Sequence, residues 1–335
     1  MKASLLGKLW RIARQLHKGG SVRAWCKRVK FCLRGLAFPS ATTEWFNVLE
    51  TPALTAVVRR RPELFQKPQR PFLASTFRTE QRLEALTQHY QFILSHFPPA
   101  WLREIHAYPG KCLGVLAGPD GGHYELRLLS SWTEREGELS LALRSRESGA
   151  TLFSLTFAMV RWEAGQGDIL IGGIQGNRKA NDKDLIISLT RQWHGLRPRA
   201  LLLFALHQLA AGWNATRVRA VSDATHVYRR WKKGKPLAFC HDDWWLEVGG
   251  HRAEDGLFDL PERFAPRDLA TVKGNKRSMY RQRYEMLEDL GRQISASLGC
   301  PFEPWLATRE AVARETTTRR PTPELVVQAV QPLAG

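Results

Sequence analysis

The middle of the chain consists of short segments of alternating apolar and polar residues, and this pattern constrains the fold most strongly. Residues 112–117, 124–129, 139–144 and 152–160 are separated by polar or glycine-bearing turns, which predicts strands of an antiparallel meander. Residues 169–174 are nearly all apolar, which predicts a strand near the centre of the sheet, buried on both faces. A further strand is expected over residues 217–222.

Segments with helical character surround these strands. Residues 44–105 are predicted to be mainly helical, with the clearest helix over 79–97, and further helices are expected over 182–193, 199–212 and 276–298. We therefore expect an α/β protein in the broad sense (α+β), with a central, mostly antiparallel sheet flanked by helices. The expected organisation is a helical segment over 1–43, a main domain over 44–298 (mainly helical to 105, sheet plus helices over 106–298) and a Pro/Thr-rich tail over 299–335.

Positive charge is concentrated at the start of the chain. Fifty Lys and Arg against 32 Asp and Glu give a formal net charge of +18, and residues 1–43 hold ten of these cations with no acidic residue before Glu44. This segment also carries two apolar stripes at helical spacing: Leu5, Leu9, Ile12 and Leu16, then Val22, Trp25, Val29, Cys32 and Leu36.

Such helices have two interpretations, which the sequence leaves open. They could lie on an anionic membrane, with cations that include Lys8, Arg11, Arg14, Lys27 and Arg28 reaching lipid phosphates. Alternatively, they could be amphipathic helices docked on the protein's own core.

The remaining composition indicates a cytoplasmic protein peripheral to the inner membrane. The five cysteines are scattered, with no C-x-x-C pair or zinc-ligand spacing, so we expect a reducing compartment and no metal ion. No segment supplies about 18 uncharged apolar residues, and Lys8, Arg11 and Arg14 interrupt any secretory signal.

Two motifs could hold an acyl donor. Residues 172–176 contain three glycines, so either another backbone or a ligand can approach closely here, and Ile174, Gln175 and Gly176 are the expected donor-binding residues. Gly195, Arg197 and Arg199 lie at a helix start and could bind the phosphates of an acyl carrier such as coenzyme A, or the arginines could be structural. Neither a dinucleotide fingerprint nor a phosphate-binding loop is present.

A third motif could move protons. The last predicted strand continues into Asp223, His226 and Tyr228, and ligands of α/β sheets favour the region beyond the carboxyl ends of strands. His226 is the best acid/base candidate, although a structural histidine is the alternative. The basic stretch 273–284 could bind nucleic acid, but no named motif supports this, so nucleic acid is an unlikely partner.

Taken in order, several segments resemble the VirK/YbjX family of bacterial proteins. These are His89-Tyr90, Glu136-Gly-Glu-Leu139, Ile171-Gly-Gly-Ile-Gln-Gly176, His194-Gly-Leu-Arg-Pro198, Ala220-Val-Ser222, His226-Val-Tyr228, Asp243 with Trp245, Lys276-Arg-Ser278 and Arg283-Tyr284. The resemblance implies a role in virulence, envelope stress and resistance to cationic antimicrobial peptides, but it carries over no catalytic residues.

The order of elements also resembles the GNAT-type acyltransferases, in which a turn like Gln192-x-x-Gly195-x-Arg197 holds coenzyme A. Here an extra helix separates the central strand from that turn. The combined expectation is a membrane-peripheral protein that transfers an acyl or aminoacyl group to a lipid or peptide amine. A non-enzymatic adaptor that binds lipid or protein is the alternative.

Overall fold

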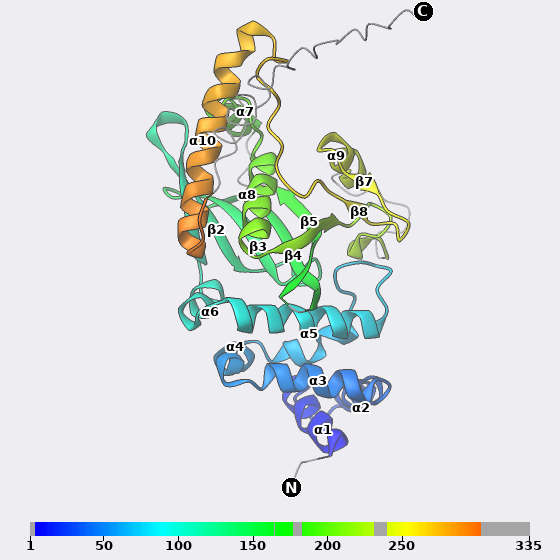
Figure 1. The fold of residues 1–335 in the computed structure, drawn as a ribbon. Coiled ribbons are helices and arrows are strands. Elements are labelled where there is room, and N and C mark those ends of the chain that lie inside the picture. Colours follow the sequence, from blue (N-terminus) through cyan, green and yellow to red (C-terminus); the bar gives the residue numbers. More distant parts are fainter. Residues whose placement is uncertain (1–3, 164, 177–182, 231–239, 303–335) are drawn as a thin grey trace, which may run out of the picture.

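The computed structural model describes residues 4–163, 165–176, 183–230 and 240–302. Within these ranges an eight-stranded sheet has the order β1-β2-β3-β4-β5-β6-β8-β7 (Figure 1). Its strands are β1 (Lys111–Ala117), β2 (His123–Ser130), β3 (Leu139–Ser145), β4 (Thr151–Glu163), β5 (Gln166–Gly176), β6 (Ala215–Ala220), β7 (His251–Arg252) and β8 (Phe258–Asp259). Only the β5–β6 pair is parallel among the paired strands described. The predicted meander and the central position of the apolar strand are confirmed.

The helices also follow the sequence pattern. They are α1 (Leu5–Leu16), α2 (Val22–Leu36), α3 (Pro39–Leu49), α4 (Thr55–Arg60), α5 (Thr79–His96), α6 (Pro99–Ile105), α7 (Lys183–Gln192), α8 (Pro198–Gly212), α9 (His241–Glu247) and α10 (Gly274–Leu298). Short 3-10 turns cover Pro52–Leu54, Pro62–Gln69, Pro119–Gly121 and Val227–Arg230. Most of the predicted Pro/Thr-rich tail lies outside the described residues.

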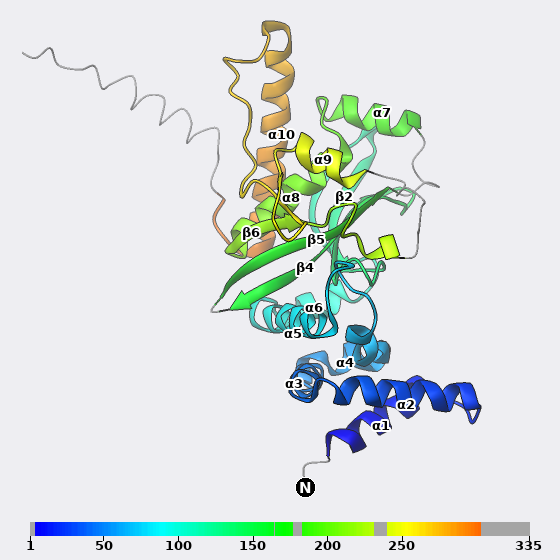
Figure 2. The same ribbon diagram turned by 90° about the vertical axis from the view of Figure 1, so that its right-hand side faces the viewer.

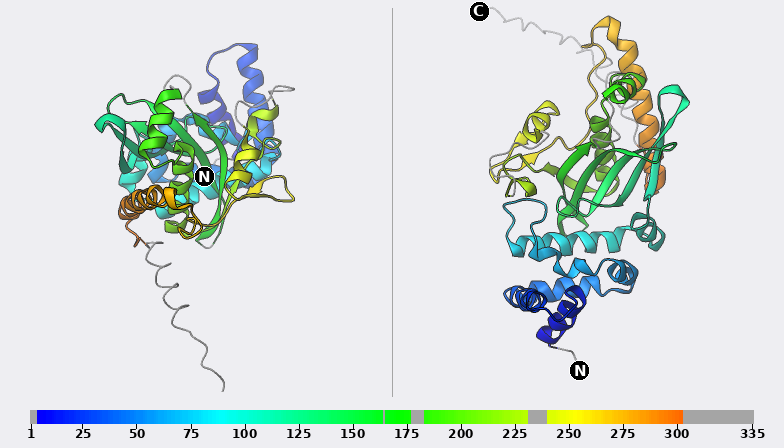
Figure 3. Two further views of the ribbon diagram at one scale, coloured as in Figure 1. Left: turned by 90° about the horizontal axis from the view of Figure 1, so that it is seen from above. Right: turned by 180° about the vertical axis from the view of Figure 1, so that it is seen from behind.

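The elements are stacked in layers. Helices α8 and α10 cover one face of the sheet and α5 covers the other (Figures 1 and 2). Helices α3 and α4 pack beyond α5, and α1 and α2 form the layer farthest from the sheet, as the view from behind also shows (Figure 3).

Strands β4 and β5 are buried on both faces, and their alternation divides the core in two. The first core lies beneath α8 and α10 and includes Phe157, Met159, Ile169 and Ile171. The second lies beneath α5 and the N-terminal helices and includes Ala158, Val160 and Leu170. Because successive strand residues point to opposite faces, one nearly continuous apolar run supplies both cores.

A turn before β3 lies directly on β5. A Cβ atom on Gly172 would lie 1.8 Å from the backbone oxygen of Glu136, and one on Gly173 would lie 2.6 Å from the Glu136 carboxyl carbon. A side chain at position 172 would collide with the backbone of the turn, and one at position 173 would collide with the Glu136 carboxyl group. Of the two explanations for these glycines, the approach of another backbone is the one observed.

We predict that Gly172→Ala lowers the free energy of unfolding by about 3 kcal/mol, because the added methyl group collides with backbone that has little room to move. Urea denaturation measures this change. Gly274→Ala is the matched control, since a Cβ there meets nothing within 4 Å, and its stability should change by less than about 1 kcal/mol. Equal stability of the two variants would contradict the contact.

Helix α8 is buried nearly all round and carries His207, which is 6% exposed. Burial lowers the pKa of His207 from 6.5 to about 4, because the charged imidazolium would lose its hydration. Between pH 6.5 and pH 4 the unfolded chain thus binds a proton that the folded chain does not bind. Stability is therefore lost as the pH falls through this window.

We predict that His207→Leu removes about 2 kcal/mol of the stability loss between pH 7 and pH 5. His89 and His106 are still present in this variant, and burial lowers their pKa values to about 3 and about 4. The variant should therefore still lose some stability as the pH falls. Urea denaturation at the two pH values tests this, with the exposed His251→Leu as control. An unchanged pH dependence in His207→Leu would refute the assignment.

Candidate functional site

Three loops meet just beyond the point where β5 and β6 stop pairing. The parallel pairing ends with Ile171 and Ala220. Beyond it lie residues 221–228 and the turn 131–138, which is joined to residues 72–75 by the Leu73 N–H to Arg135 oxygen bond. Inside the first loop, the buried Ser222 hydroxyl and Thr225 hydroxyl lie 3.0 Å apart and brace a turn. Ser222 is thus a structural group.

Glu136 is the centre of this site. Its carboxylate, in a side chain only 1% exposed, accepts two 2.8 Å hydrogen bonds from the Gln175 amide. The Nε2 atom of His226 lies 3.4 Å from Glu136 Oε1. On the other side of the ring, His226 Nδ1 accepts the Tyr228 backbone N–H at 3.3 Å. A ring with Nδ1 as acceptor carries its proton on Nε2, so it can donate that proton towards Glu136.

A second histidine stacks beside the first. The His226 and His241 ring centroids are 4.9 Å apart with an interplanar angle of 32°. His241 is 4% exposed, and its Nδ1 lies 2.9 Å from Asp223 Oδ1, which also accepts the His241 backbone N–H at 3.0 Å. If Nδ1 donates to the carboxylate, Nε2 is the basic nitrogen of the ring.

The site thus holds two histidines, each oriented by a carboxylate. Burial and the neighbouring His226 lower the pKa of His241, while Asp223 opposes them. A neutral imidazole held by a carboxylate is the arrangement that general-base catalysis uses. Asp223 lies within hydrogen-bond distance of His241 Nδ1, whereas His226 Nε2 lies 3.4 Å from Glu136.

The neighbouring hydroxyl and thiol are poor nucleophiles. Tyr228 is half-buried, and its pKa is raised by burial and by the negative charge of Glu136. The pKa of Cys240 is raised to about 11, chiefly by its hydrogen bond to Asp243. Neither group is ionised near neutral pH.

The residues predicted to bind an acyl donor lie in separate places. Ile174 is buried in the core, Gln175 belongs to the Glu136 cluster, and Gly176 ends β5 next to residues outside the described ranges.

The helix-start residues pack towards α9 and α10 instead. A Cβ on Gly195 would lie 2.7 Å from the Arg283 guanidinium. Arg199 forms a 2.9 Å ion pair with Glu247, and Arg197 lies 3.9 Å from the same carboxylate. Phosphates bound here would compete with Glu247 for both guanidinium groups.

The turn that carries Glu136 also places a second buried glutamate. Glu138 accepts a 2.9 Å hydrogen bond from the Tyr90 hydroxyl and forms an ion pair with the buried Lys67. Burial and the Glu138 charge raise the pKa of Tyr90 well above its usual value. This pair ties the turn to α5 and to the 3-10 turn Pro62–Gln69, and its role is structural.

The N-terminal helices divide between the two interpretations. The α1 stripe docks on the body: Leu9 and Ile12 are buried in the same core as Trp45. Most of the α2 stripe does not, since Val22 is 79% and Trp25 55% exposed.

The basic residues predicted to bind membrane divide in the same way. Lys8 pairs with Glu50 at 2.6 Å, and Arg28 donates to the backbone oxygens of His17 and Gly19. Arg11, Arg14 and Lys27 are exposed. Of the helices in the described ranges, none combines the length and the hydropathy needed to cross a bilayer.

Two members of the site, Glu136 and His241, were not predicted from the sequence. Glu136 precedes a strand in an ordinary polar turn, and only its packing on adjacent glycines distinguishes it from a surface acid. His241 stands 15 residues after His226, with residues outside the described ranges between them. In the described part of the chain, no three His, Cys, Asp or Glu side chains are placed to hold a metal ion.

Comparison with known proteins assigns the family. The family described as "Protein of unknown function (DUF535)" matches residues 20–296. The "Uncharacterized protein YbjX" of Escherichia coli is 32% identical over 274 residues, which are 80% of this chain and 82% of the relative. "Membrane protein LapB" of Mannheimia haemolytica is 28% identical over 208 residues, 60% of this chain and 86% of that protein.

One similar solved structure is a mutant of a cAMP-binding acyltransferase from Mycobacterium smegmatis. The two sequences are 10% identical, and the matched region is 55% of this chain and 56% of the acyltransferase chain. Its TM-score of 0.26 is too low to identify an activity. The match over residues 20–296 and the YbjX relative are sufficient: the chain belongs to the DUF535 family of YbjX-like proteins.

Proposed function

We propose that this protein docks peripherally on the cytoplasmic surface of an anionic membrane through α2 and acts there in envelope defence. The observation that carries the proposal is an exposed apolar stripe on α2, formed by Val22, Trp25, Leu33 and Leu36, with the half-buried Val29 among them. Cys32, which was predicted to lie on this stripe, is instead buried. Leu33 and Leu36 are 63% and 40% exposed. Exposed aromatic and aliphatic side chains in a row are typical of helices that lie in a lipid interface.

The charge of the same helix supports an anionic lipid partner. Arg23, Lys27, Lys30 and Arg34 are exposed on another side of α2, and the sequence has no acid before Glu44. Each such cation near an anionic surface contributes about 1 kcal/mol to binding. The name of the relative from Mannheimia haemolytica, membrane protein LapB, agrees with this proposal. The roles in virulence, envelope stress and antimicrobial-peptide resistance that the resemblance implies remain part of it.

We predict that the double variant Trp25→Ser/Leu33→Ser binds phosphatidylglycerol-containing vesicles about 10- to 100-fold more weakly than the wild type, because it removes two side chains that would enter the interface. Vesicle co-sedimentation measures the affinity. Substitution is preferable to deleting residues 1–38, because deletion would also remove Leu9 and Phe31 from the core.

The matched control is Trp132→Ser/Leu246→Ser, whose side chains are 50% and 60% exposed but lie outside α1 and α2. It should bind vesicles like the wild type. For the wild type and both double variants, vesicle binding should weaken as the salt concentration rises, and it should be weaker on vesicles made of phosphatidylcholine alone. Undiminished binding of the Trp25/Leu33 variant would reject α2 as the membrane surface.

We further propose that the histidine pair supports transfer of an acyl or aminoacyl group to a lipid or peptide amine. The observation that favours it is the pair of neighbouring histidines. Asp223 contacts His241, and Glu136 lies close to His226. In such a step the amine nitrogen bonds to the donor carbonyl carbon as the bond to the leaving thiol or alcohol breaks. His241 would take the proton from the amine and return it to the leaving group. Coenzyme A stays one proposed donor; a non-enzymatic adaptor is the alternative function.

We predict that His241→Gln lowers the amount of acylated product at least about 100-fold while vesicle binding is unchanged. Mass spectrometry of lipids and peptides from cells with wild-type protein, the variant or no protein measures the product. Because burial keeps the pKa of His241 below 6.5, the wild-type rate should persist somewhat below that pH. The exposed His251→Gln is the control. Identical profiles in all strains would leave the adaptor as the function.

A further inference from the structure

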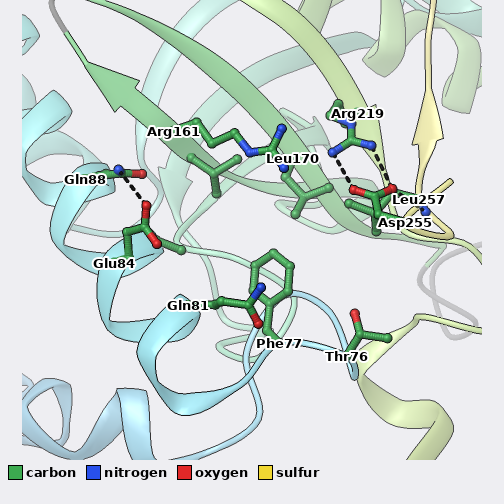
Figure 4. Close-up of a pocket in the computed structure, with 12 residues that line it drawn as sticks. Thr76, Phe77, Gln81, Glu84, Gln88, Arg161, Leu170, Arg219, Asp255 and Leu257 are labelled. Atoms are coloured by element: carbon green, nitrogen blue, oxygen red, sulfur yellow. Dashed lines mark hydrogen bonds and ion pairs between the residues drawn. The ribbon is translucent and has the colours of Figure 1, made fainter. Parts of the chain in front are cut away.

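A cavity of about 310 Å³ lies between α5, strands β4 to β6 and the turn that precedes β8 (Figure 4). It shares no lining residue with the Glu136–His241 site. The volume is at the lower end of the range for small-molecule sites, which corresponds to a ligand of dipeptide size. Neither the family match nor the histidine chemistry assigns a role to this cavity.

One wall of the cavity is a polar face of α5. Gln81, Glu84, Ala85 and Gln88 line it at the spacing that places residues on one side of a helix. The Gln88 amide donates to Glu84 Oε1 at 3.3 Å, so this carboxylate is oriented at the cavity wall. The wall therefore offers one negative charge and two amide groups, each able to donate and accept hydrogen bonds.

Strand β4 brings a cation on strained backbone to the cavity. Arg161 has φ of 54°, the left-handed region, where the pairing of β4 with β5 becomes irregular between Val160 and Glu163. Residues other than glycine adopt this conformation at a cost, and such strain concentrates at functional positions. The guanidinium of Arg161 lies 3.7 Å from Asp168, whose carboxylate already accepts two hydrogen bonds from Arg217 at 2.8 and 3.2 Å.

The ion pair on the side of the cavity opposite α5 is internally satisfied. Arg219 is 5% exposed and donates to both oxygens of Asp255 at 2.9 Å, and it also pairs with Asp259. In Figure 4 the Glu84–Gln88 pair and the Arg219–Asp255 pair lie on opposite sides, with Arg161 and Leu170 between them. Arg161 and Glu84 thus remain the two charges most available to a ligand.

Apolar side chains line the space between these charges. They are Phe77, Val160, Leu170 and Leu257. Leu170 and Leu257 also belong to the core beneath α5, so this surface is rigidly supported. A ligand that covers it must carry an apolar group as well as charges.

We propose that this cavity binds a zwitterionic peptide of about two residues with apolar side chains. Its ammonium group pairs with Glu84, its carboxylate pairs with Arg161, and its amide meets Gln81 and Gln88. A fatty acid would bring no cation to Glu84, and an apolar amine would bring no anion to Arg161. Only a ligand with both charges complements both walls.

The test is calorimetric titration with L-leucyl-L-leucine and two derivatives that each lack one charge. N-acetyl-leucyl-leucine has no ammonium group, and leucyl-leucinamide has no carboxylate. The full-length protein is compared with Glu84→Gln and Arg161→Gln. The controls are Glu80→Gln, an exposed α5 residue that does not line the cavity, and the exposed Arg103→Gln.

We expect Glu84→Gln to weaken leucyl-leucine binding about 10-fold and to leave N-acetyl-leucyl-leucine unaffected. Arg161→Gln should weaken leucyl-leucine similarly and leave leucyl-leucinamide unaffected. Both control variants should bind like the wild type. The proposal is overturned if leucyl-leucine shows no saturable binding up to about 10 mM. It is also overturned if each substitution weakens all three compounds equally, or if the controls lose as much affinity.

Discussion

The packing of the Glu136 turn on Gly172 and Gly173 is the contact on which the rest of the site depends. Because Gly172 has no side chain, the backbone of the turn can lie against the middle of β5, and because Gly173 has none, the Glu136 carboxyl group fits beside it. The turn then places two glutamates into the interior. Glu136 faces Gln175 and His226, and Glu138 faces Tyr90 and Lys67.

Burying two carboxylates so close together is stable only because each has its own donors. A buried carboxylate without partners costs several kcal/mol, which exceeds what one surface contact returns. Glu138 is compensated by a cation and a hydroxyl, whereas Glu136 is compensated by an amide and an imidazole. Glu138 thereby ties the turn to α5, whereas Glu136 lies beside His226, a member of the histidine pair that we propose for proton transfer.

The layered arrangement separates three roles. The sheet and α8 supply the rigid core, α5 forms the wall of the cavity, and α1 and α2 form the outermost layer (Figure 2). Docking of α1 through Leu9 and Ile12 fixes the position of α2, whose own apolar stripe stays largely exposed. The membrane surface that we propose is therefore part of the folded body and moves with it.

Much of the fold followed from the sequence alone. The alternation in residues 112–160 and the apolar run at 169–174 determined the order and nature of the strands, because strand periodicity is a local property. The position of Asp223, His226 and Tyr228 beyond β6 was likewise predictable. Glu136 and His241 were not identified, because a turn acid and a helix-start histidine become distinctive only through neighbours that are remote in sequence.

The two stripes at the start of the chain show the same limit. Periodicity predicted both amphipathic helices, but it could not distinguish a stripe that packs on Trp45 from one that faces outward. It also could not show that Arg197 and Arg199 share Glu247. The sequence alone determined the helices, strands and charge, which depend on residues close along the chain. The tertiary structure decided which faces are buried and which charges are paired, because those depend on surfaces that only folding brings together.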